Sequence, residues 1–558
     1  MNKLRKALII TSAIFCQSLL FGQNPYLPLW EYIPDGEPYV FEDPDRPGEY
    51  RVYIYGSHDT QKDSYCGRDQ VVWSASVNDL RHWRYDGVIF TSEKDRDGNA
   101  LREDGLGDVL FAPDIAVRQA GDRKLYYLYP NTQDGRRHTM VAVSERPDGP
   151  FKVVNWSKDD PAATSGVLGF DPAVFVDDDG RVYGYWGFEH SYGAELDPEN
   201  MADVLEGTEI VDGMIPSCRD EGEFRFFEAS SLRKIEDKYV LIYSRMTAEG
   251  ENGLPACNYN LAYAYSDAPL GPWTYGGTII DCRGRDTDAG GKVICTGCPY
   301  GNTHGSIVKI GKQWWVFYHR QTGTDEYSRQ AMVSPIEVKV QKGKGGKVSI
   351  SEAEITSEGF SLEGLDPLRK TPAGLACYFW NPGGVRQKYP NFFFSGPYVK
   401  PTRPGEGHEA ISSHRECHCP VVNNTPGSTV GYKYMNFNIL DSALSRSSGK
   451  RALLELEIVP EGNAGVISVL AGGPTPEQGG VEIARFGVRD ARSSGHVRLS
   501  AECRNLRKLK GKQPLFFVFS APEDSSSAGT ANSAGASSSA AAGTKLICEL
   551  HSFRFAVQ

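Results

Sequence analysis

Short apolar and aromatic runs alternate with clusters of Gly, Asp, Asn and Pro along the chain from residue 24 to about residue 350. Runs such as 50–55, 124–129 and 239–243 have the length and composition of β-strands, and the residues between them are typical of turns. No long segment repeats its apolar positions with the period of about 3.6 residues that marks an amphipathic helix. The pattern therefore predicts an all-β fold.

A unit of the same order occurs five times: a turn with an acid or a histidine, an apolar run, a glycine turn and a strand rich in Tyr or Trp. The residues that mark the units, about 55–80 positions apart, are Asp35, Asp114, Asp171, Glu228 and His304. This spacing is typical of a β-propeller with five four-stranded blades, which would direct these side chains toward one axis. A β-sandwich with similarly spaced strands is the alternative.

The pattern changes near residue 365, and 558 residues exceed what one hydrophobic core usually organises. We therefore predict a propeller at 24–365 and a second β-rich domain at 366–558. Between strands expected at 513–519 and 546–555 lies a tract of Ser, Ala, Gly and Thr near 525–543. It has too few apolar residues to order itself, so we expect a disordered loop.

Residues 1–23 are predicted to be a secretion signal, because basic residues precede an apolar run at 7–21. That run is shorter than the ~20 residues of a membrane-spanning helix, so no membrane association is expected after its removal. We expect an exported protein, periplasmic or extracellular in a Gram-negative bacterium. Lipid attachment at Cys16 is the alternative, although Phe15 stands where a small residue is needed.

The chain has twelve cysteines, and removal of the predicted signal with Cys16 leaves eleven. Because an exported compartment permits disulfides, we expect some of them to pair, and the odd number leaves at least one free thiol. Cys282, Cys295, Cys298 and His304 offer the donor types of a zinc site. Their first spacing is loose, so buried thiols or a local disulfide are the preferred interpretation.

The charge balance restricts the partners that this chain is expected to bind. The formal net charge is −11, with 71 acidic and 60 basic residues. Nucleic acids and anionic membranes select for clustered Lys and Arg, so neither is an expected partner. A neutral polymer such as a polysaccharide fits this composition better.

Cleavage of a glycosidic bond needs one carboxylic acid that protonates the leaving oxygen and one carboxylate that acts on water or on the sugar. Asp35, Asp171 and Glu228 each adjoin apolar residues at the start of a unit. Partial burial there would raise the pKa of such an acid and suit it to donate a proton. Together, at matching places in successive units, the three favour a catalytic site.

Taken singly, the three acids have other interpretations. Asp35 precedes Gly and Asp171 precedes Pro, and both are ordinary positions for turn acids. Glu228 follows two Phe residues, which fits a buried, paired acid as well as a functional one. Glu37, two residues after Asp35, is an alternative for the role of base.

An ordered set of motifs gives the residues from 24 to about 350 a family resemblance. They are Asn24-Pro25 with Asp35, then 111–114 (FAPD), 170–172 (FDP), 181–187 (RVYGYWG), 227–230 (FEAS), 239–244 (YVLIYS), 301–305 (GNTHG) and 315–320 (WVFYHR). In this order they resemble glycoside hydrolase family 43. The resemblance implies a five-bladed β-propeller and an inverting mechanism that requires no cofactor. It assigns Asp35 as general base, Glu228 as general acid and Asp171 as the residue that orients the acid and modulates its pKa.

The same resemblance implies roles for four further residues. His304 matches an axial histidine that contacts the sugar and helps to hold a calcium ion or a water cluster, and Arg329 matches an arginine that reaches the site from the fifth blade. His58 and Trp186 are expected to line the sugar subsite. Without the resemblance, His304 would be a core histidine and Arg329 part of a surface salt bridge.

The second domain resembles a family 6 carbohydrate-binding module through 430–437 (VGYKYMNF) and 546–555 (LICELHSFRF). This implies a jelly-roll-like β-sandwich. Exposed aromatic rings in such a module stack on pyranose rings, but the aromatic residues of these two motifs fit a core equally well. Both sugar binding and a purely structural role stay open.

The activity expected from the resemblance is that of an exo-acting α-L-arabinofuranosidase on plant cell-wall polysaccharides or oligosaccharides. β-Xylosidase and galactan-cleaving activities are alternatives within the same family. A catalytically inactive glycan-binding propeller is an alternative of another class. A metal hydrolase is disfavoured, since no His-rich ligand cluster is present in the sequence.

Overall fold

The computed structural model describes residues 22–61, 63–402, 419–446, 449–490, 492, 495–522 and 545–558. Residues 1–21 of the predicted secretion signal and the loop predicted near 525–543 lie outside them. Within the described residues, no helix has the length and apolar character needed to cross a membrane.

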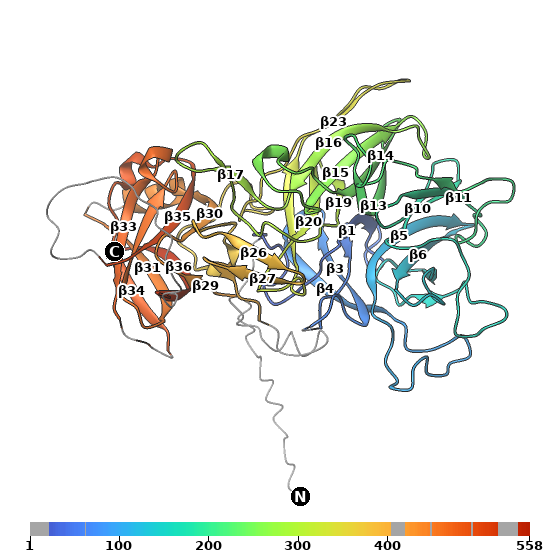
Figure 1. The fold of residues 1–558 in the computed structure, drawn as a ribbon, viewed down its shortest axis with the longest axis horizontal. Coiled ribbons are helices and arrows are strands. Elements are labelled where there is room, and N and C mark those ends of the chain that lie inside the picture. Colours follow the sequence, from blue (N-terminus) through green and yellow to red (C-terminus); the bar gives the residue numbers. More distant parts are fainter. Residues whose placement is uncertain are drawn as a thin grey trace, which may run out of the picture.

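The first four blades are antiparallel sheets of four consecutive strands each (Figure 1). They are β1 (Glu37–Glu42), β2 (Tyr50–Tyr55), β3 (Asp69–Ser76) and β4 (Asp79–Thr91); β5 (Phe111–Ala120), β6 (Arg123–Asn131), β7 (Ala142–Ser144) and β8 (Lys152–Val153); β9 (Ala173–Val176), β10 (Val182–Trp186), β11 (Tyr192–Leu196) and β12 (Val211–Asp212); and β13 (Phe226–Ile235), β14 (Lys238–Arg245), β15 (Asn260–Ser266) and β16 (Thr274–Asp281). Tight turns join neighbouring strands, as the Gly-containing sequences predicted.

The fifth blade combines both ends of the propeller sequence. Its sheet contains β19 (Ser306–Ile310), β20 (Gln313–Arg320) and β21 (Gln330–Ile336). The segment before β1 runs beside β21: the Asn24 side chain donates to the Val333 carbonyl at 2.6 Å and accepts from its N–H at 2.9 Å. The first and last parts of the ring are thereby tied together. Two hairpins extend from the propeller, β17 (Arg285–Thr287) with β18 (Val293–Cys295) and β22 (Val338–Val340) with β23 (Val348–Ile350).

Aromatic residues fill the space between blades, which explains the Tyr and Trp content of the strands. Buried tyrosines also cross from blade to blade. The Tyr55 hydroxyl donates to the Pro147 carbonyl of the second blade, and the Tyr185 hydroxyl of the third blade donates to the Pro269 carbonyl of the fourth. Both of these rings are buried while their hydroxyls stay hydrogen-bonded, whereas the buried Tyr53 hydroxyl and the indole N–H groups of Trp273 and Trp315 have no partner among the described residues.

The described residues of the second domain form two packed sheets, one α-helix and three short 3-10 helices. One sheet has the order β28-β29-β36-β31-β34 with β24 on β36, and the other has the order β25-β30-β35-β32-β33. Their bounds are β24 (Thr371–Pro372), β25 (Tyr378–Trp380), β28 (Tyr398–Val399), β29 (Val421–Asn424), β30 (Thr429–Asn436), β31 (Ala452–Pro460), β32 (Gly465–Ala471), β33 (Val481–Val488), β34 (Val497–Glu502), β35 (Lys512–Ser520), β36 (Cys548–Val557) and α2 (Phe437–Ser445). A separate hairpin, β26 (Val385–Lys388) with β27 (Asn391–Phe394), lies between this domain and the propeller in Figure 1.

The buried aromatic residues of the two motifs in this domain lie in its core. Tyr432, Phe553 and Phe555 are buried with the aliphatic residues of both sheets. Leu29 of the propeller segment packs into the same core. The predicted all-β fold, a five-bladed propeller followed by a β-sandwich, is confirmed.

The two domains are joined by polar contacts as well as by this packing. Arg320 on β20 donates to the carbonyls of Gly374 and Ala376. The Gly323 N–H donates to the Val399 carbonyl at 2.8 Å. Because these contacts involve main-chain groups of both domains, the sandwich is fixed against the fifth blade.

The expected disulfides do not form among the described residues: all ten cysteines there are free, and most are buried. The zinc alternative is not supported either. The Cys282 thiol contacts the Thr303 hydroxyl at 3.4 Å, and the Cys295 thiol donates to the Arg283 carbonyl at 3.1 Å. Within the described part of the chain, no cluster of His, Cys, Asp and Glu is placed to hold a metal ion.

Candidate active site

The three predicted acids lie at the starts of the inner strands, at one end of the propeller. Asp35 and Asp171 occupy the turns before β1 and β9, with φ angles of 59° and 49°. Asp tolerates this left-handed conformation better than most residues. Glu228 lies on β13 at a register shift next to Ala229, whose φ is 67°. Such a bulge re-aims a side chain, which explains how an acid inside a strand joins two acids in turns.

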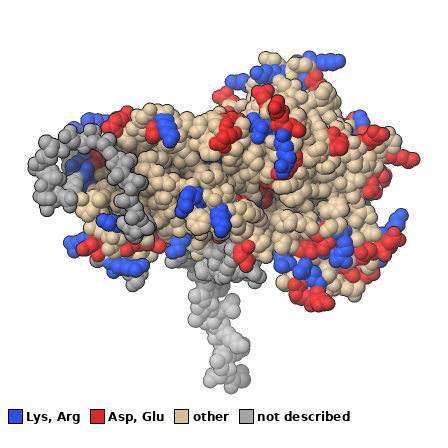
Figure 2. Space-filling model, in the orientation of Figure 1, with Lys and Arg blue, Asp and Glu red and all other residues tan. Residues whose placement is uncertain are grey.

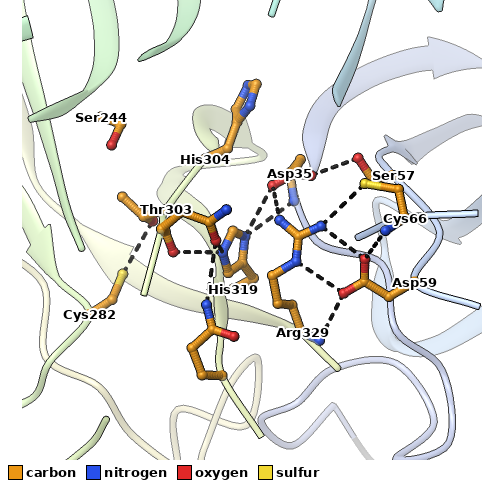
Figure 3. A network of polar contacts seen from close by, with 12 residues as sticks. Asp35, Ser57, Asp59, Cys66, Ser244, Cys282, Thr303, His304, His319 and Arg329 are labelled. Atoms are coloured by element: carbon orange, nitrogen blue, oxygen red, sulfur yellow. Dashed lines mark hydrogen bonds and ion pairs between the residues drawn. The ribbon is translucent and has the colours of Figure 1, made fainter. Parts of the chain in front are cut away.

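Asp35 is buried within a set of donors (Figure 3). The Ser57 hydroxyl donates to Asp35 Oδ2 at 2.6 Å, and Arg329 Nη1 donates to Oδ1 at 3.1 Å. Burial acts to raise the pKa of Asp35, but Arg329, His304 and the hydrogen bond from Ser57 outweigh it, and the pKa is lowered. Asp35 is therefore held as a carboxylate that can accept a proton from water.

Arg329 is itself fixed by a second carboxylate. Its Nε and Nη2 donate to Asp59 Oδ2 and Oδ1 at 3.0 and 2.8 Å, and both residues are fully buried. Two parallel bonds of this kind orient a guanidinium rigidly. Arg329 reaches the site from the fifth blade, as the resemblance implied, and Asp59 determines its direction.

His319 on β20 is the second neighbour of Asp35. Its Nδ1 accepts the Asp35 backbone N–H at 3.3 Å, and its Nε2 is 2.9 Å from the Asn302 carbonyl. Burial lowers the pKa of His319 to about 4 despite the nearby Asp35. The ring is thus neutral with its proton on Nε2, and it positions the Asp35 backbone.

Glu228 has the opposite electrostatic environment. Burial raises the pKa of Glu228 well above its ordinary value, and the charge of Asp171 raises it further, against the opposing effect of His304. The raised pKa favours the protonated carboxyl of Glu228, which is the form that can donate a proton. The pKa values of the two buried acids, Asp35 and Glu228, are thus shifted in opposite directions.

His304 lies between two carboxylates. Its Nδ1 is 3.6 Å from Asp171 Oδ2, and its Nε2 is 3.6 Å from Glu37 Oε1. Burial acts to lower the pKa of His304, but Asp171 and Glu37 outweigh it, and the pKa is raised well above its usual range. A cationic His304 compensates Asp171, whose own pKa is raised by burial.

The axial channel beneath these residues contains its own cation, Arg233. Its Nη2 donates to Glu37 Oε2 at 2.7 Å, and its guanidinium lies 4.4 Å from the centre of the Tyr39 ring. Asp114 accepts from the Tyr39 hydroxyl and the Val174 N–H, both at 2.8 Å. Burial, with Glu37, raises the pKa of Asp114 to about 7.

These residues do not fit the calcium ion expected near His304. Calcium takes six to eight oxygen ligands, whereas Glu37 is paired with Arg233 and faces a cationic imidazole. The positive charge of the channel is thus supplied by side chains. Glu37, the alternative base, is paired much as Asp35 is, with an arginine, Arg233, and a serine, Ser231. The choice of Asp35 as the candidate base therefore rests on the family resemblance.

Two of the residues expected to line the sugar subsite lie elsewhere. His58 is fully buried between Glu31 and Asp69, at 3.1 and 3.0 Å. Trp186 is buried in the core between the second and third blades and stacks on Tyr192. Neither presents a face to a ligand in this arrangement. Both were inferred from motif position, which does not reveal the direction of a side chain.

The residues that position the candidate base are not among those predicted from the sequence. Ser57 and Asp59 flank His58 in the sequence and are the residues that contact Asp35 and Arg329. His319 lies in the motif at 315–320 but received no role there. The available signal was the run of polar residues directly after the apolar strand β2.

An aromatic cluster adjoins the other two acids. Phe188 is 50% exposed, and its ring centre lies 5.2 Å from that of Phe170 and 5.1 Å from that of Phe227. Phe170 and Phe227 directly precede Asp171 and Glu228. Phe188 therefore places an exposed apolar ring near the candidate acid, and the half-buried rings of Phe170 and Phe227 support it.

Comparison with known proteins gives consistent matches. Residues 40–341 match the family model of glycosyl hydrolases family 43. A xylosidase/arabinosidase from Thermoclostridium stercorarium is 33% identical over 436 residues, covering 74% of this chain and 82% of that protein. An arabinoxylan arabinofuranohydrolase from Paenibacillus polymyxa is 26% identical over 371 residues, covering 63% of this chain and 53% of that protein.

Among solved structures, a family 43 arabinoxylan arabinofuranohydrolase from Bacillus subtilis in complex with cellotetraose is 19% identical. The match covers 95% of this chain and 97% of that one, with a TM-score of 0.41. The family model spans more than half of the chain, and the Thermoclostridium relative is similar over most of both proteins. The chain therefore belongs to glycosyl hydrolases family 43 and is a glycoside hydrolase.

Proposed function

We propose that this protein is an inverting, exo-acting α-L-arabinofuranosidase that removes L-arabinofuranose from the side chains of plant polysaccharides. The observation that carries the hydrolytic part is the contrast between two buried carboxyls. The pKa of Asp35 is lowered against its burial by Arg329, and the pKa of Glu228 is raised by burial and Asp171. Groups whose pKa values are driven apart in this way suit the roles of base and acid.

In the proposed reaction, Asp35 accepts a proton from a water molecule while the oxygen of that water attacks the anomeric carbon. Glu228 donates its proton to the glycosidic oxygen as the bond to the leaving group breaks. Burial and the charge of Asp171 raise the pKa of Glu228, which favours the protonated form that this step needs. The attack from the face opposite to the leaving group inverts the anomeric configuration of the released sugar.

The choice of sugar rests on the names of the relatives. One is named an arabinoxylan arabinofuranohydrolase, which supports arabinose release. The relative from Thermoclostridium is named for both xylosidase and arabinosidase activity, which makes β-xylosidase the second candidate. Galactan cleavage is the third activity to be assayed, since family membership alone does not determine the sugar.

Three nitrophenyl glycosides, the α-L-arabinofuranoside, β-D-xyloside and β-D-galactoside, assayed side by side test the proposal. We expect the highest kcat/KM on the arabinoside, and turnover of another glycoside without the arabinoside would replace the first choice. Proton NMR of the first product should show the inverted anomer. Glu228→Gln should lower kcat by about 10²–10⁴-fold. Equal background hydrolysis by wild type and Glu228→Gln, with glycan binding retained, would instead identify a binding protein.

We also propose that the protein is exported and that its second domain is a sandwich of the family 6 module type. Cell fractionation of the source bacterium tests the first point, with recovery from the periplasm or medium expected. Recovery from the cytoplasm with the N-terminal segment intact would contradict it.

A further inference from the structure

The β26–β27 hairpin of the second domain is attached to the loop that delivers Arg329 to the site. Phe392 on β27 is buried, and its N–H donates to the Thr324 carbonyl at 2.8 Å. Gln387 on β26 donates to Glu326 Oε1 at 2.7 Å. This loop joins β20 to β21, and Arg329 is its last residue. The second domain therefore reaches the end of the propeller that carries the candidate acids.

The tip of the hairpin completes a group of three tyrosines from three separate segments. Tyr65 follows β2, Tyr327 precedes β21 and Tyr389 forms the turn of the hairpin. The rings of Tyr65 and Tyr327 meet edge to face with centres 5.0 Å apart. Tyr65 donates to Glu326. Tyr389 lies near enough to Tyr65 and Tyr327 to add to the effect of burial, which raises the pKa of both. Glu326 thus holds both the hairpin and the tyrosine that stands beneath its tip.

This tyrosine group is one contact away from the candidate base. The Arg329 guanidinium lies 5.2 Å from the centre of the Tyr65 ring and donates to Asp35 at 3.1 Å. Tyr65 and Tyr327 are partly buried, whereas Tyr389 is 68% exposed. The exposed ring of Tyr389 belongs to neither core, so folding does not explain its presence at this position.

We propose that Tyr65, Tyr327 and Tyr389 form a glycan subsite, built by both domains, that binds the polysaccharide beyond the sugar being cleaved. The inference rests on the proposed function, since it assumes that the buried acids act on a glycan. Tyrosine combines a flat apolar face, on which a sugar ring can stack, with a hydroxyl that hydrogen-bonds sugar hydroxyls. The subsite makes the second domain part of the substrate-binding face.

Kinetics of Tyr389→Ala test the subsite with two substrates: nitrophenyl α-L-arabinofuranoside, and xylotriose bearing one arabinofuranosyl branch. We expect KM for the branched oligosaccharide to rise about three- to tenfold, the usual range for one aromatic contact. The loss of kcat/KM should be at least threefold larger on the oligosaccharide than on the nitrophenyl glycoside. Tyr389→Phe keeps the ring and should retain most of the affinity.

The matched control is Tyr50→Ala. Tyr50 is 49% exposed and begins β2, at the end of that strand opposite to the loop of Tyr65. This variant should behave as the wild type with both substrates. If Tyr389→Ala also matches the wild type on the branched oligosaccharide, the proposed subsite is wrong.

A binding experiment separates this proposal from the proposed function. Calorimetric titration of Glu228→Gln, with and without Tyr389→Ala, with the branched xylotriose, xylotetraose and β-1,3-galactotriose measures affinity without turnover. A three- to tenfold loss of affinity supports the subsite even if wild type cleaves no arabinoside. If wild type cleaves the arabinoside but Glu228→Gln binds these glycans equally well with and without Tyr389→Ala, the proposed subsite is wrong and the proposed function stands.

Discussion

Replacement of Arg329 by Met tests how the candidate base is kept ionised. The substitution keeps an apolar side chain of similar reach and removes the cation that bonds Asp35 at 3.1 Å and Asp59 at 2.8 and 3.0 Å. Asp35 retains the Ser57 hydroxyl as a donor. Both carboxylates stay buried without a cationic partner, and this arrangement is costly.

The expected loss of unfolding free energy is about 5 kcal/mol. Removal of one partner of a buried ion pair costs about 3–5 kcal/mol, and two carboxylates share this partner, which places the estimate at the upper end. Coulomb attraction at 3.1 Å and an effective dielectric constant of about 20 gives a similar figure. Chemical denaturation followed by fluorescence of the nine tryptophans measures the change.

Arg123→Met provides the control, since Arg123 forms an exposed pair with Glu145 at 2.6 Å. Exposed pairs contribute about 0–1 kcal/mol, so this variant should stay close to the wild type. Asp59→Asn added to Arg329→Met removes one uncompensated charge and should recover more than about 1 kcal/mol. A loss below about 1 kcal/mol for Arg329→Met, equal to that of the control, would refute the reasoning.

The same variant should change the pH dependence of catalysis. Arg329 lowers the pKa of Asp35 against the effect of burial, so its removal makes ionisation of Asp35 harder and raises that pKa. The acidic limb of the kcat/KM profile should therefore move to higher pH. A lowered pKa in the folded state stabilises the fold above the unfolded pKa, and that stabilisation is lost as pH falls through the folded pKa. Arg329→Met should therefore lack the contribution that ionised Asp35 makes to the stability of the wild type.

Three further outcomes are expected. Asp171→Asn removes a negative charge that raises the pKa of Glu228, so the alkaline limb of kcat/KM should move to lower pH, and an unmoved limb would contradict the assignment. Burial acts to lower the pKa of His58, but Glu31 and Asp69 raise it to about 10. The contribution of the protonated His58 to the stability of the fold is therefore present below about pH 6.5 and lost as pH rises toward 10. Denaturation at pH 6 and pH 10 should show this loss of unfolding free energy in the wild type and not in His58→Phe. At pH 6 the substitution itself should cost about 3–5 kcal/mol. Equal pH dependence in the two proteins would contradict the role given to His58. Because Arg233 supplies the positive charge of the axial channel, EDTA should leave both activity and melting temperature unchanged. An EDTA-induced loss that calcium restores would show that an ion is bound after all.

The order of strands and the positions of the five marker residues could be predicted because both depend on local patterns. Strands and turns have recognisable compositions, and equal spacing in the sequence becomes symmetry around an axis in a propeller. Asp35, Asp171 and Glu228 therefore came together as expected. The bulge at Glu228, which turns its carboxyl toward the other two, has no composition of its own and was not foreseen.

The direction of individual side chains could not be predicted from the motifs. In an extended segment neighbouring side chains point to opposite sides, so an error of one position selects the wrong face. This is why His58 was chosen although Ser57 and Asp59 contact the site. The pairing of Arg233 with Glu37 joins residues 196 positions apart, and no pattern within either segment indicates it.

The contacts of Arg320 and Gly323 with the sandwich also have a consequence for the proposed binding of one glycan by both domains. A module on a flexible linker raises the local concentration of substrate over a broad range of distances, and the length of the linker sets that range. Here main-chain carbonyls of the second domain are bonded directly to the fifth blade, so the separation between the two domains is constant. A glycan that contacts both domains at once must match this one separation in length and branching, and chains too short to span it gain nothing from the second domain.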